Sequence, residues 1–254
     1  MPSTFTHSPA EIERKEPGIG GKPPVTRRPT GGGGGGGDDD WKNDGRGPRA
    51  RLRRARQAIF MLLAADLVMF VVLVIAFYAR QSGMHFNPAT RERIGDWHPI
   101  SLPPILFLNT AALLLSSLTI ELARRHIFRE LDVLEEWLGM GKPALKRALP
   151  WLGATLALGL LFFAGQLVAW KQLSAQGFVF GRWATPSSYF FYMITGFHAL
   201  HVMVGVVALI WCLTALRFYK SVERRQIVID CTAWFWDTMG LAWLVLFAVL
   251  AWGQ

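Results

Sequence analysis

The chain has 254 residues, of which 52% are hydrophobic and 13% aromatic, a composition typical of an integral membrane protein. A formal net charge of +9 is also a feature of nucleic-acid-binding proteins, but the basic residues lie beside apolar stretches, as topology signals do, which argues against a nucleic-acid partner. The two cysteines, Cys212 and Cys231, lack metal-ligand spacing and are interpreted as structural thiols. Because the first apolar segment starts only near Gln57, we expect no cleavable signal peptide.

Residues 1–56 are predicted to form a flexible cytoplasmic tail that ends in a basic, membrane-proximal segment. The glycine run from Gly31 to Gly37 buries no surface and keeps the chain flexible. The tail is either a tether without a function of its own or a docking segment that orders on a partner, with Trp41 as its anchor. Five arginines between residues 49 and 56 precede the first apolar segment and indicate a cytoplasmic N-terminus.

The remaining domain, residues 57–254, is predicted to be an all-α integral membrane bundle of five transmembrane helices. Apolar segments long enough to cross a bilayer lie at about residues 57–78, 100–122, 150–170, 188–216 and 228–252. The 27 Lys and Arg residues all lie outside these segments, and most of them fall on the side that holds the N-terminus. The positive-inside rule therefore predicts that the N-terminus is inside and the C-terminus outside.

Polar residues mark the first two spans. Asp66 lies midway along the first span, and an intramembrane carboxylate is either a functional site or a structural acid hydrogen-bonded between helices. The second span contains small polar residues that suit close helix packing. Glu121, at its end, lies one turn from Arg124 and Arg125, which predicts an ion pair at the membrane interface rather than catalysis.

A surface helix is predicted on the cytoplasmic side between the second and third spans, closed by Gly139 and Gly141. The apolar positions that recur at helical spacing there are Ile127, Leu131, Leu134 and Leu138. Gln166 is the main polar interruption of the third span. The fifth span is rich in tryptophan, and because several of its tryptophans fall mid-span, we expect them to contact protein rather than the membrane interfaces.

The fourth span places two histidines near mid-membrane. Because His198 and His201 are three residues apart, they lie on nearly the same helix face. Burying imidazoles in hydrocarbon without partners is unfavourable, so this face is predicted to pack against protein. Asp66 and Asp237 lie at a comparable depth, and we expect one of the histidines to hydrogen-bond an aspartate or a main-chain carbonyl, which would tie the fourth span to the first or fifth.

The fourth span also carries a family resemblance. The run Thr195-Gly196-Phe197-His198-Ala199-Leu200-His201-Val202 resembles the signature of subunit III of the haem–copper cytochrome c oxidases, in its short, five-helix bacterial form. Other segments that resemble this family are Asp66-Leu67-Val68-Met69-Phe70, Leu108-Asn109-Thr110, Gly159-Leu160-Leu161-Phe162-Phe163 with Gln166, and Ala233-Trp234-Phe235-Trp236. The resemblance covers roughly residues 57–253.

The chain also departs from the family pattern. Asp66 and Ala169 stand where the family usually has glutamates. In the last span, Asp237 stands in place of a histidine and Gly240 in place of an aspartate. The two extra N-terminal helices of the long forms are missing as well.

The resemblance implies a non-catalytic subunit of a respiratory terminal oxidase that carries electrons from cytochrome c to oxygen. Such a subunit has no catalytic or metal-binding residue; haem and copper reside in partner subunits, phospholipid is bound, and subunits I and II are its partners. It would stabilise subunit I, support proton uptake and span the bacterial inner membrane several times. The residues singled out for structural, lipid-related or proton-related roles are Asp66, Gln166, His198, His201 and Asp237.

Three other functions compete with this one. An accessory subunit of a quinol oxidase or nitric oxide reductase would look much the same, because other subunits choose the electron donor. An independent haem or quinone enzyme is disfavoured, because two histidines on one face, His198 and His201, cannot sandwich an iron. A small transporter that uses Asp66 and Asp237 is disfavoured because five spans cannot form two equal halves and no internal repeat is visible.

Overall fold

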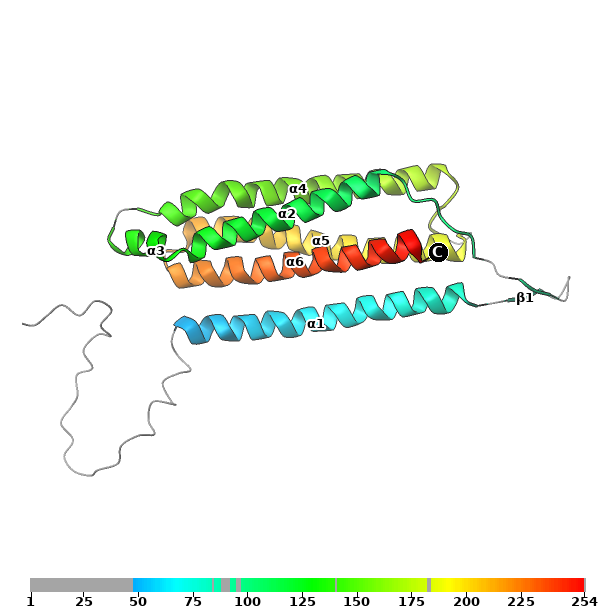
Figure 1. The fold of residues 1–254 in the computed structure, drawn as a ribbon, viewed down its shortest axis with the longest axis horizontal. Helices are drawn as coiled ribbons and strands as arrows, with labels where there is room; N and C mark the ends of the chain where they lie inside the picture. Colours follow the sequence, from blue (N-terminus) through cyan, green and yellow to red (C-terminus); the bar gives the residue numbers. More distant parts are fainter. Residues whose placement is uncertain are drawn as a thin grey trace, which may run out of the picture. The chain divides into compact units, whose positions relative to one another are not determined.

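The computed structural model describes residues 48–83, 85–87, 92–94, 97–139, 141–181 and 184–253. Within this part, five helices are long and apolar enough to cross a membrane (Figure 1). They are α1 (Pro48–Gln81), α2 (Ile105–Phe128), α4 (Pro143–Ala175), α5 (Pro186–Phe218) and α6 (Val222–Trp252). The predicted all-helical fold with five spans is therefore confirmed. The glycine run and Trp41 lie outside the described residues, so both interpretations of the tail stay predictions.

Prolines explain where two helices start differently from the predicted spans. α2 begins at Ile105 rather than near residue 100, because Pro103 and Pro104 precede it and proline fits only the first turn of a helix without disrupting it. α4 begins at Pro143, and Pro150, where the third span was predicted to start, lies inside the helix. A membrane helix tolerates such a proline because neighbouring helices and local adjustments satisfy the freed carbonyl.

The connections between the spans contain one short helix and one hairpin. α3 (Glu130–Trp137) is the predicted surface helix, and Gly139 and Gly141 follow it with φ angles of 79° and 100°, a region that favours glycine. α3 is shorter than predicted because α2 continues to Phe128 and buries Ile127 in the bundle. The antiparallel strands β1 (His85–Asn87) and β2 (Glu92–Ile94) were not predicted, since three-residue strands are too short for an alternating pattern.

Small and hydroxyl-bearing residues allow α2 and α4 to pack more closely than any other pair of helices in the described part. A Cβ atom added at Gly165 of α4 would lie 2.0 Å from Oδ1 of Asn109 on α2. Farther along the same seam, the hydroxyl oxygens of Thr119 and Thr155 are 2.8 Å apart. The two helices are therefore held by backbone proximity and by the hydrogen bond between Thr119 and Thr155 inside the membrane-spanning part.

Trp236 of α6 fills the centre of the bundle. Its Nε1 donates to Oγ of Ser116 on α2 at 2.9 Å. Cβ atoms added at Gly159 of α4 and at Gly205 of α5 would lie 2.6 Å and 3.0 Å from the nearest atoms of the same ring. Trp236 and Trp243 are buried, as the mid-span tryptophans were predicted to be. One indole thus fixes the spacing of four helices.

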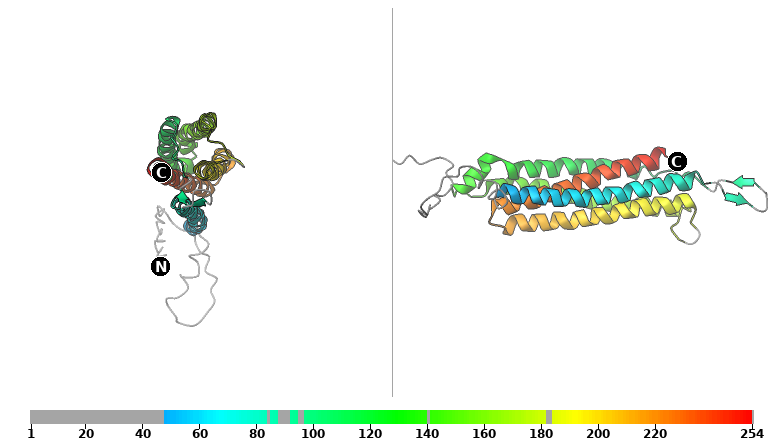
Figure 2. Two further views of the ribbon diagram at one scale, coloured as in Figure 1. Left: turned by 90° about the vertical axis from the view of Figure 1, so that its right-hand side faces the viewer. Right: turned by 90° about the horizontal axis from the view of Figure 1, so that it is seen from below.

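α1 lies at the edge of this bundle. It packs mainly on α6 and less on α5, as the view along the helices shows (Figure 2). Only 17% of its most apolar window is buried, against 39–56% in the other four spanning helices. α1 therefore offers an apolar surface and two flanking seams, one with α5 and one with α6, to lipid or to another protein.

Candidate functional site

In the seam between α1 and α5, two ionisable side chains face each other within the membrane-spanning part. Nε2 of His201 lies 3.8 Å from Oδ1 of Asp66, and the two side chains are 19% and 22% exposed. This separation exceeds a hydrogen bond but remains within ion-pair range. The side chains stand against Phe70, whose ring centroid is 5.2 Å from that of His201.

The other nitrogen of His201 fixes its tautomer. Nδ1 lies 2.7 Å from the carbonyl oxygen of Phe197, one turn back in α5. Because a carbonyl oxygen can only accept, Nδ1 carries a hydrogen and donates it. In the neutral ring Nε2 is then the nitrogen without a hydrogen, and it is the one that faces Asp66. The hydrogen bond to a main-chain carbonyl stays within α5, whereas the contacts with Asp66 and Phe70 reach α1.

His198 occupies a different environment from His201. It is fully buried, and its ring centroid lies 4.9 Å from Trp243, 5.9 Å from Phe162 and 6.2 Å from Phe70. Neither ring nitrogen has a hydrogen-bond partner among the described residues. Three residues fall about 60° short of a full helical turn, and this offset directs the two histidines toward different neighbours. His198 thus packs as an aromatic side chain of the core.

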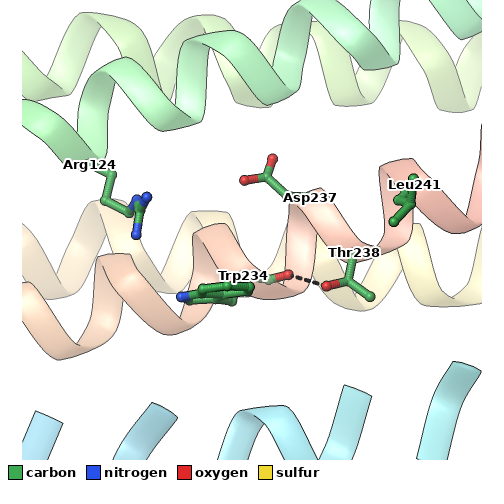
Figure 3. A pocket seen from close by; sticks show the side chains of 5 residues that line it. All are labelled: Arg124, Trp234, Asp237, Thr238 and Leu241. Carbon is green, nitrogen blue, oxygen red and sulfur yellow. Dashed lines mark hydrogen bonds between the residues drawn. The ribbon is translucent and has the colours of Figure 1, made fainter. Parts of the chain in front are cut away.

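Asp237 lies between α2 and α6, away from both histidines. It lines a cavity of about 210 Å³ together with Arg124, Trp234, Thr238 and Leu241 (Figure 3). Its Oδ1 is buried and unpartnered within the described ranges. The nearby hydroxyl of Thr238 donates instead to the carbonyl of Trp234 at 2.8 Å. The side chain therefore keeps an unused acceptor at the rim of the bundle.

Gln166 is buried in α4 beside the contact between Gly165 and Asn109. It is 1% exposed, and neither of its amide atoms has a hydrogen-bond partner in the described part of the chain. Nδ2 of Asn109 is also unpartnered there. The apolar interior therefore contains amide atoms of Gln166 and Asn109 that have no hydrogen-bond partner among the described residues.

The strongest ionic contacts join α1, α2 and α6 at the end of the bundle that carries α3. Nε and Nη2 of Arg56 donate to the two carboxylate oxygens of Asp230 at 2.6 and 3.2 Å, and Nη1 of Arg124 donates to Asp230 at 3.0 Å. Glu121 accepts from Arg124 at 2.7 Å and from Arg125 at 3.0 Å, which confirms the ion pair predicted for Glu121. We call Arg56, Glu121, Arg124, Arg125 and Asp230 the charge cluster.

Sequence reasoning missed the centre of this cluster. Asp230 is 0% exposed and lies in the first turns of the predicted fifth span. The sequence signal for this contact was a carboxylate just inside the fifth span together with arginines just before the first span. Two further pairs at the same end were also missed: Arg51 with Glu223, at 2.5 and 2.9 Å, and the buried Arg225 with Glu136 of α3.

Within the residues that the structure describes, no group of three or more His, Cys, Asp or Glu side chains is placed to hold a metal ion. The site consists of an acid–imidazole pair in the membrane, the half-buried carboxyl group of Asp237 and a charge cluster at one end of the bundle. These features concern polar contacts between helices within the bundle and ionic contacts at one of its ends.

Comparison with known proteins identifies the family. The family model of cytochrome c oxidase subunit III matches residues 50–254. Proteins named cytochrome c oxidase subunit 3 match over 203 residues in Ornithorhynchus anatinus (28% identical, 78% of this chain and 69% of the relative) and in Branchiostoma lanceolatum (29% identical, 78% and 68%). The family has no redox centre of its own. The chain belongs to the cytochrome c oxidase subunit III family and is a non-catalytic, multi-pass membrane subunit of a respiratory oxidase complex.

Proposed function

We propose that this chain stabilises subunit I of a bacterial cytochrome c oxidase and supports proton uptake while the enzyme turns over. Haem and copper belong, in this proposal, to partner subunits, and subunits I and II and phospholipid are its neighbours in the inner membrane. The names of the relatives support cytochrome c, rather than a quinol, as the electron donor. The pair formed by Asp66 and His201 is the observation that carries the proton-related part.

The chemistry of this pair supports a proton-holding role. Nε2 of His201 lies 3.8 Å from the carboxylate of Asp66, within ion-pair range, so a small movement of either side chain would bring the two groups into hydrogen-bond contact. The hydrogen bond from Nδ1 to Phe197 keeps the ring oriented as the proton moves. Because both side chains are partly exposed in the seam beside α1, a polar group of a neighbouring subunit can contact them without opening the core. The side chain of Asp66 is one methylene shorter than that of a glutamate. The close approach of His201 makes up for this shorter reach.

Asp237 supports a contact with subunit I. A buried acceptor without a partner is unfavourable by about 1–3 kcal/mol. Trp234 and Leu241, which line the same cavity, are 47% and 60% exposed, so this part of α6 is open to a neighbour. A hydrogen-bond donor on a helix of subunit I would bind the half-buried carboxyl group of Asp237 at its accessible side. Gln166 and His198, which lie in the interior, act in helix packing.

Substitution of Asp66 by asparagine in the native complex tests the proton-related role. We expect normal assembly and a normal haem spectrum, because an asparagine side chain has the same shape as an aspartate side chain. We also expect a proton-uptake rate lowered a few-fold, because the amide cannot bind a proton with His201. Flow-flash measurements with a pH dye give the rate. Thr214→Val is the control, since Thr214 is exposed on α5 and its hydroxyl donates to the carbonyl of Trp211 in the same helix. A rate equal to wild type in Asp66→Asn would remove this pair from proton uptake.

The orientation of the chain is a second part of the proposal. Arg56, Arg124 and Arg225 are at the end of the bundle that carries α3, which supports a cytoplasmic N-terminus and a C-terminus outside. We expect an alkaline phosphatase fusion in the loop after Gly177 to be active, and one after Gly139 to be inactive. Green fluorescent protein at the same two positions should give the opposite pattern. Activity of the phosphatase after Gly139 would reverse the topology.

A further inference from the structure

Three polar side chains lie together in the interior of the bundle. α2, α4, α5 and α6 surround this interior, each packed against the next, and α1 lies outside it (Figure 2). Asn109 of α2, Gln166 of α4 and His198 of α5 are each at most 3% exposed, so their side chains are inside the bundle. We call these three residues the polar layer.

Contacts between the helices place the polar layer at one depth. Nε1 of Trp170 on α4 donates to Oγ1 of Thr195 on α5 at 3.0 Å, which fixes the register of these two antiparallel neighbours. From Trp170 back to Gln166, α4 covers about 6 Å; from Thr195 on to His198, α5 covers about 4.5 Å in the same direction. Asn109 packs against the glycine that precedes Gln166. The three side chains therefore enter the interior at nearly the same level.

The polar layer has unused hydrogen-bonding atoms. Five of its buried side-chain atoms have no partner among the described residues: Nδ2 of Asn109, Nε2 and Oε1 of Gln166, and both ring nitrogens of His198. The amide nitrogens donate, the amide oxygen accepts, and a neutral imidazole supplies one donor and one acceptor. Buried polar groups are as a rule bonded to protein or to ordered water. A molecule that both donates and accepts hydrogen bonds would satisfy this set.

Aromatic rings enclose the polar layer. Nε1 of Trp243 on α6 donates to Oγ1 of Thr110 on α2 at 3.0 Å, and its ring centroid lies 4.9 Å from that of His198, so one indole spans the layer from α2 to α5. The rings of Phe162 and Phe70 lie 5.9 Å and 6.2 Å from His198. All three rings are buried, and the five unpartnered atoms are inaccessible from the surface. A ligand of this layer is therefore small.

We infer that the polar layer binds water inside the bundle. A buried water typically makes about three hydrogen bonds, so five free atoms suit about two water molecules. Water donates to Oε1 of Gln166 and to the unprotonated nitrogen of His198, and it accepts from the amide nitrogens. It thereby links α2, α4 and α5. This site goes beyond the proposed function and does not depend on proton uptake, because Phe70 stands between His198 and the pair of Asp66 and His201.

X-ray footprinting of the whole oxidase complex in ¹⁸O-labelled water tests this site. A short X-ray pulse converts water, including bound water, into hydroxyl radicals that hydroxylate the nearest side chains, and mass spectrometry of peptides locates the label. Trp236 is the internal reference, since it is 2% exposed on the same helix and its Nε1 already donates to Ser116. We expect Trp243 in wild type to be hydroxylated severalfold faster than Trp236.

Two variants remove polar atoms from the layer at nearly constant shape. We expect Gln166→Met and His198→Phe each to lower hydroxylation of Trp243 severalfold, toward the rate of Trp236. Gln172→Met is the matched control, since Gln172 is exposed on the same helix as Gln166, and it should leave the rate unchanged. A haem spectrum and the elution volume of each complex show that it is assembled.

Two results would overturn the inference. Equal hydroxylation of Trp243 and Trp236 in wild type would mean that the interior is dry and that the amides and the imidazole bond one another after a change of rotamer; this comparison needs no variant to assemble. Faster labelling of Trp243 that persists unchanged in an assembled Gln166→Met or His198→Phe complex would mean that the polar layer does not hold the water.

Discussion

Asp230→Asn is expected to lower the thermal stability of the oxidase complex strongly and to reduce the amount of this chain found in it. Asp230 is fully buried and accepts hydrogen bonds from Arg56 and Arg124. Without its charge, two guanidinium groups from different helices face each other across a neutral amide. Removing one partner of a buried ion pair typically destabilises a protein by about 3–5 kcal/mol. We expect the lower end, since Arg56 reaches solvent and Arg124 keeps Glu121.

Thermal unfolding, followed by size-exclusion chromatography of heated complex, measures this effect. Glu223→Gln is the matched control: it also removes a carboxylate that binds an arginine of α1, but Arg51 is 57% exposed. Exposed pairs contribute only about 0.2–1 kcal/mol. Equal stability of the two variants would mean that the charge cluster does not hold α1 to the bundle.

The ion pairs of Glu121 and Asp230 differ in how far apart their residues lie in the sequence, and this difference explains why only the first was predicted. The Glu121 pair was predictable because its arginines are three and four residues away, so helical spacing alone brings them together. Asp230 and Arg56 are 174 positions apart, and only the arrangement of the helices makes them neighbours. A buried carboxylate near the start of a span shows that a partner is needed, but not which helix supplies it.

The same limit applies to the candidate site. Hydropathy was enough to find five spans, because a bilayer requires long apolar helices whatever their arrangement. Helical spacing placed His198 and His201 on one side of α5. Asp66, Asp237 and a main-chain carbonyl were the partners considered for a histidine, but spacing did not choose among them or reveal that His198 would meet Trp243, since those neighbours depend on how α6 and α1 rotate about their axes. Asp237, one of the alternative partners considered for a histidine, lines a cavity with Arg124.

The closest approach in the bundle leads to the second prediction of large effect. Gly165→Ala is expected to destabilise the complex, because the new Cβ would lie 2.0 Å from Oδ1 and 2.8 Å from Nδ2 of Asn109. Asn109 is 3% exposed and has little room to move. Overpacking of this kind typically destabilises a protein by about 1–3 kcal/mol, which outweighs the gain of up to about 1 kcal/mol in helix propensity. Thermal unfolding of the purified complex gives the difference.

A double variant separates this clash from other effects of the substitution. Asn109→Ala removes the atoms that the new methyl group meets, so Gly165→Ala with Asn109→Ala should be more stable than the sum of the two single changes predicts. Gly153→Ala is the matched control in α4, since its Cβ would meet nothing within 4 Å. It should be neutral or slightly stabilising. If Gly165→Ala behaved like Gly153→Ala, and Asn109→Ala gave no rescue, then α2 and α4 would pack less closely at this point than their side chains indicate, and the buried amides of Asn109 and Gln166 would have room for partners between the two helices.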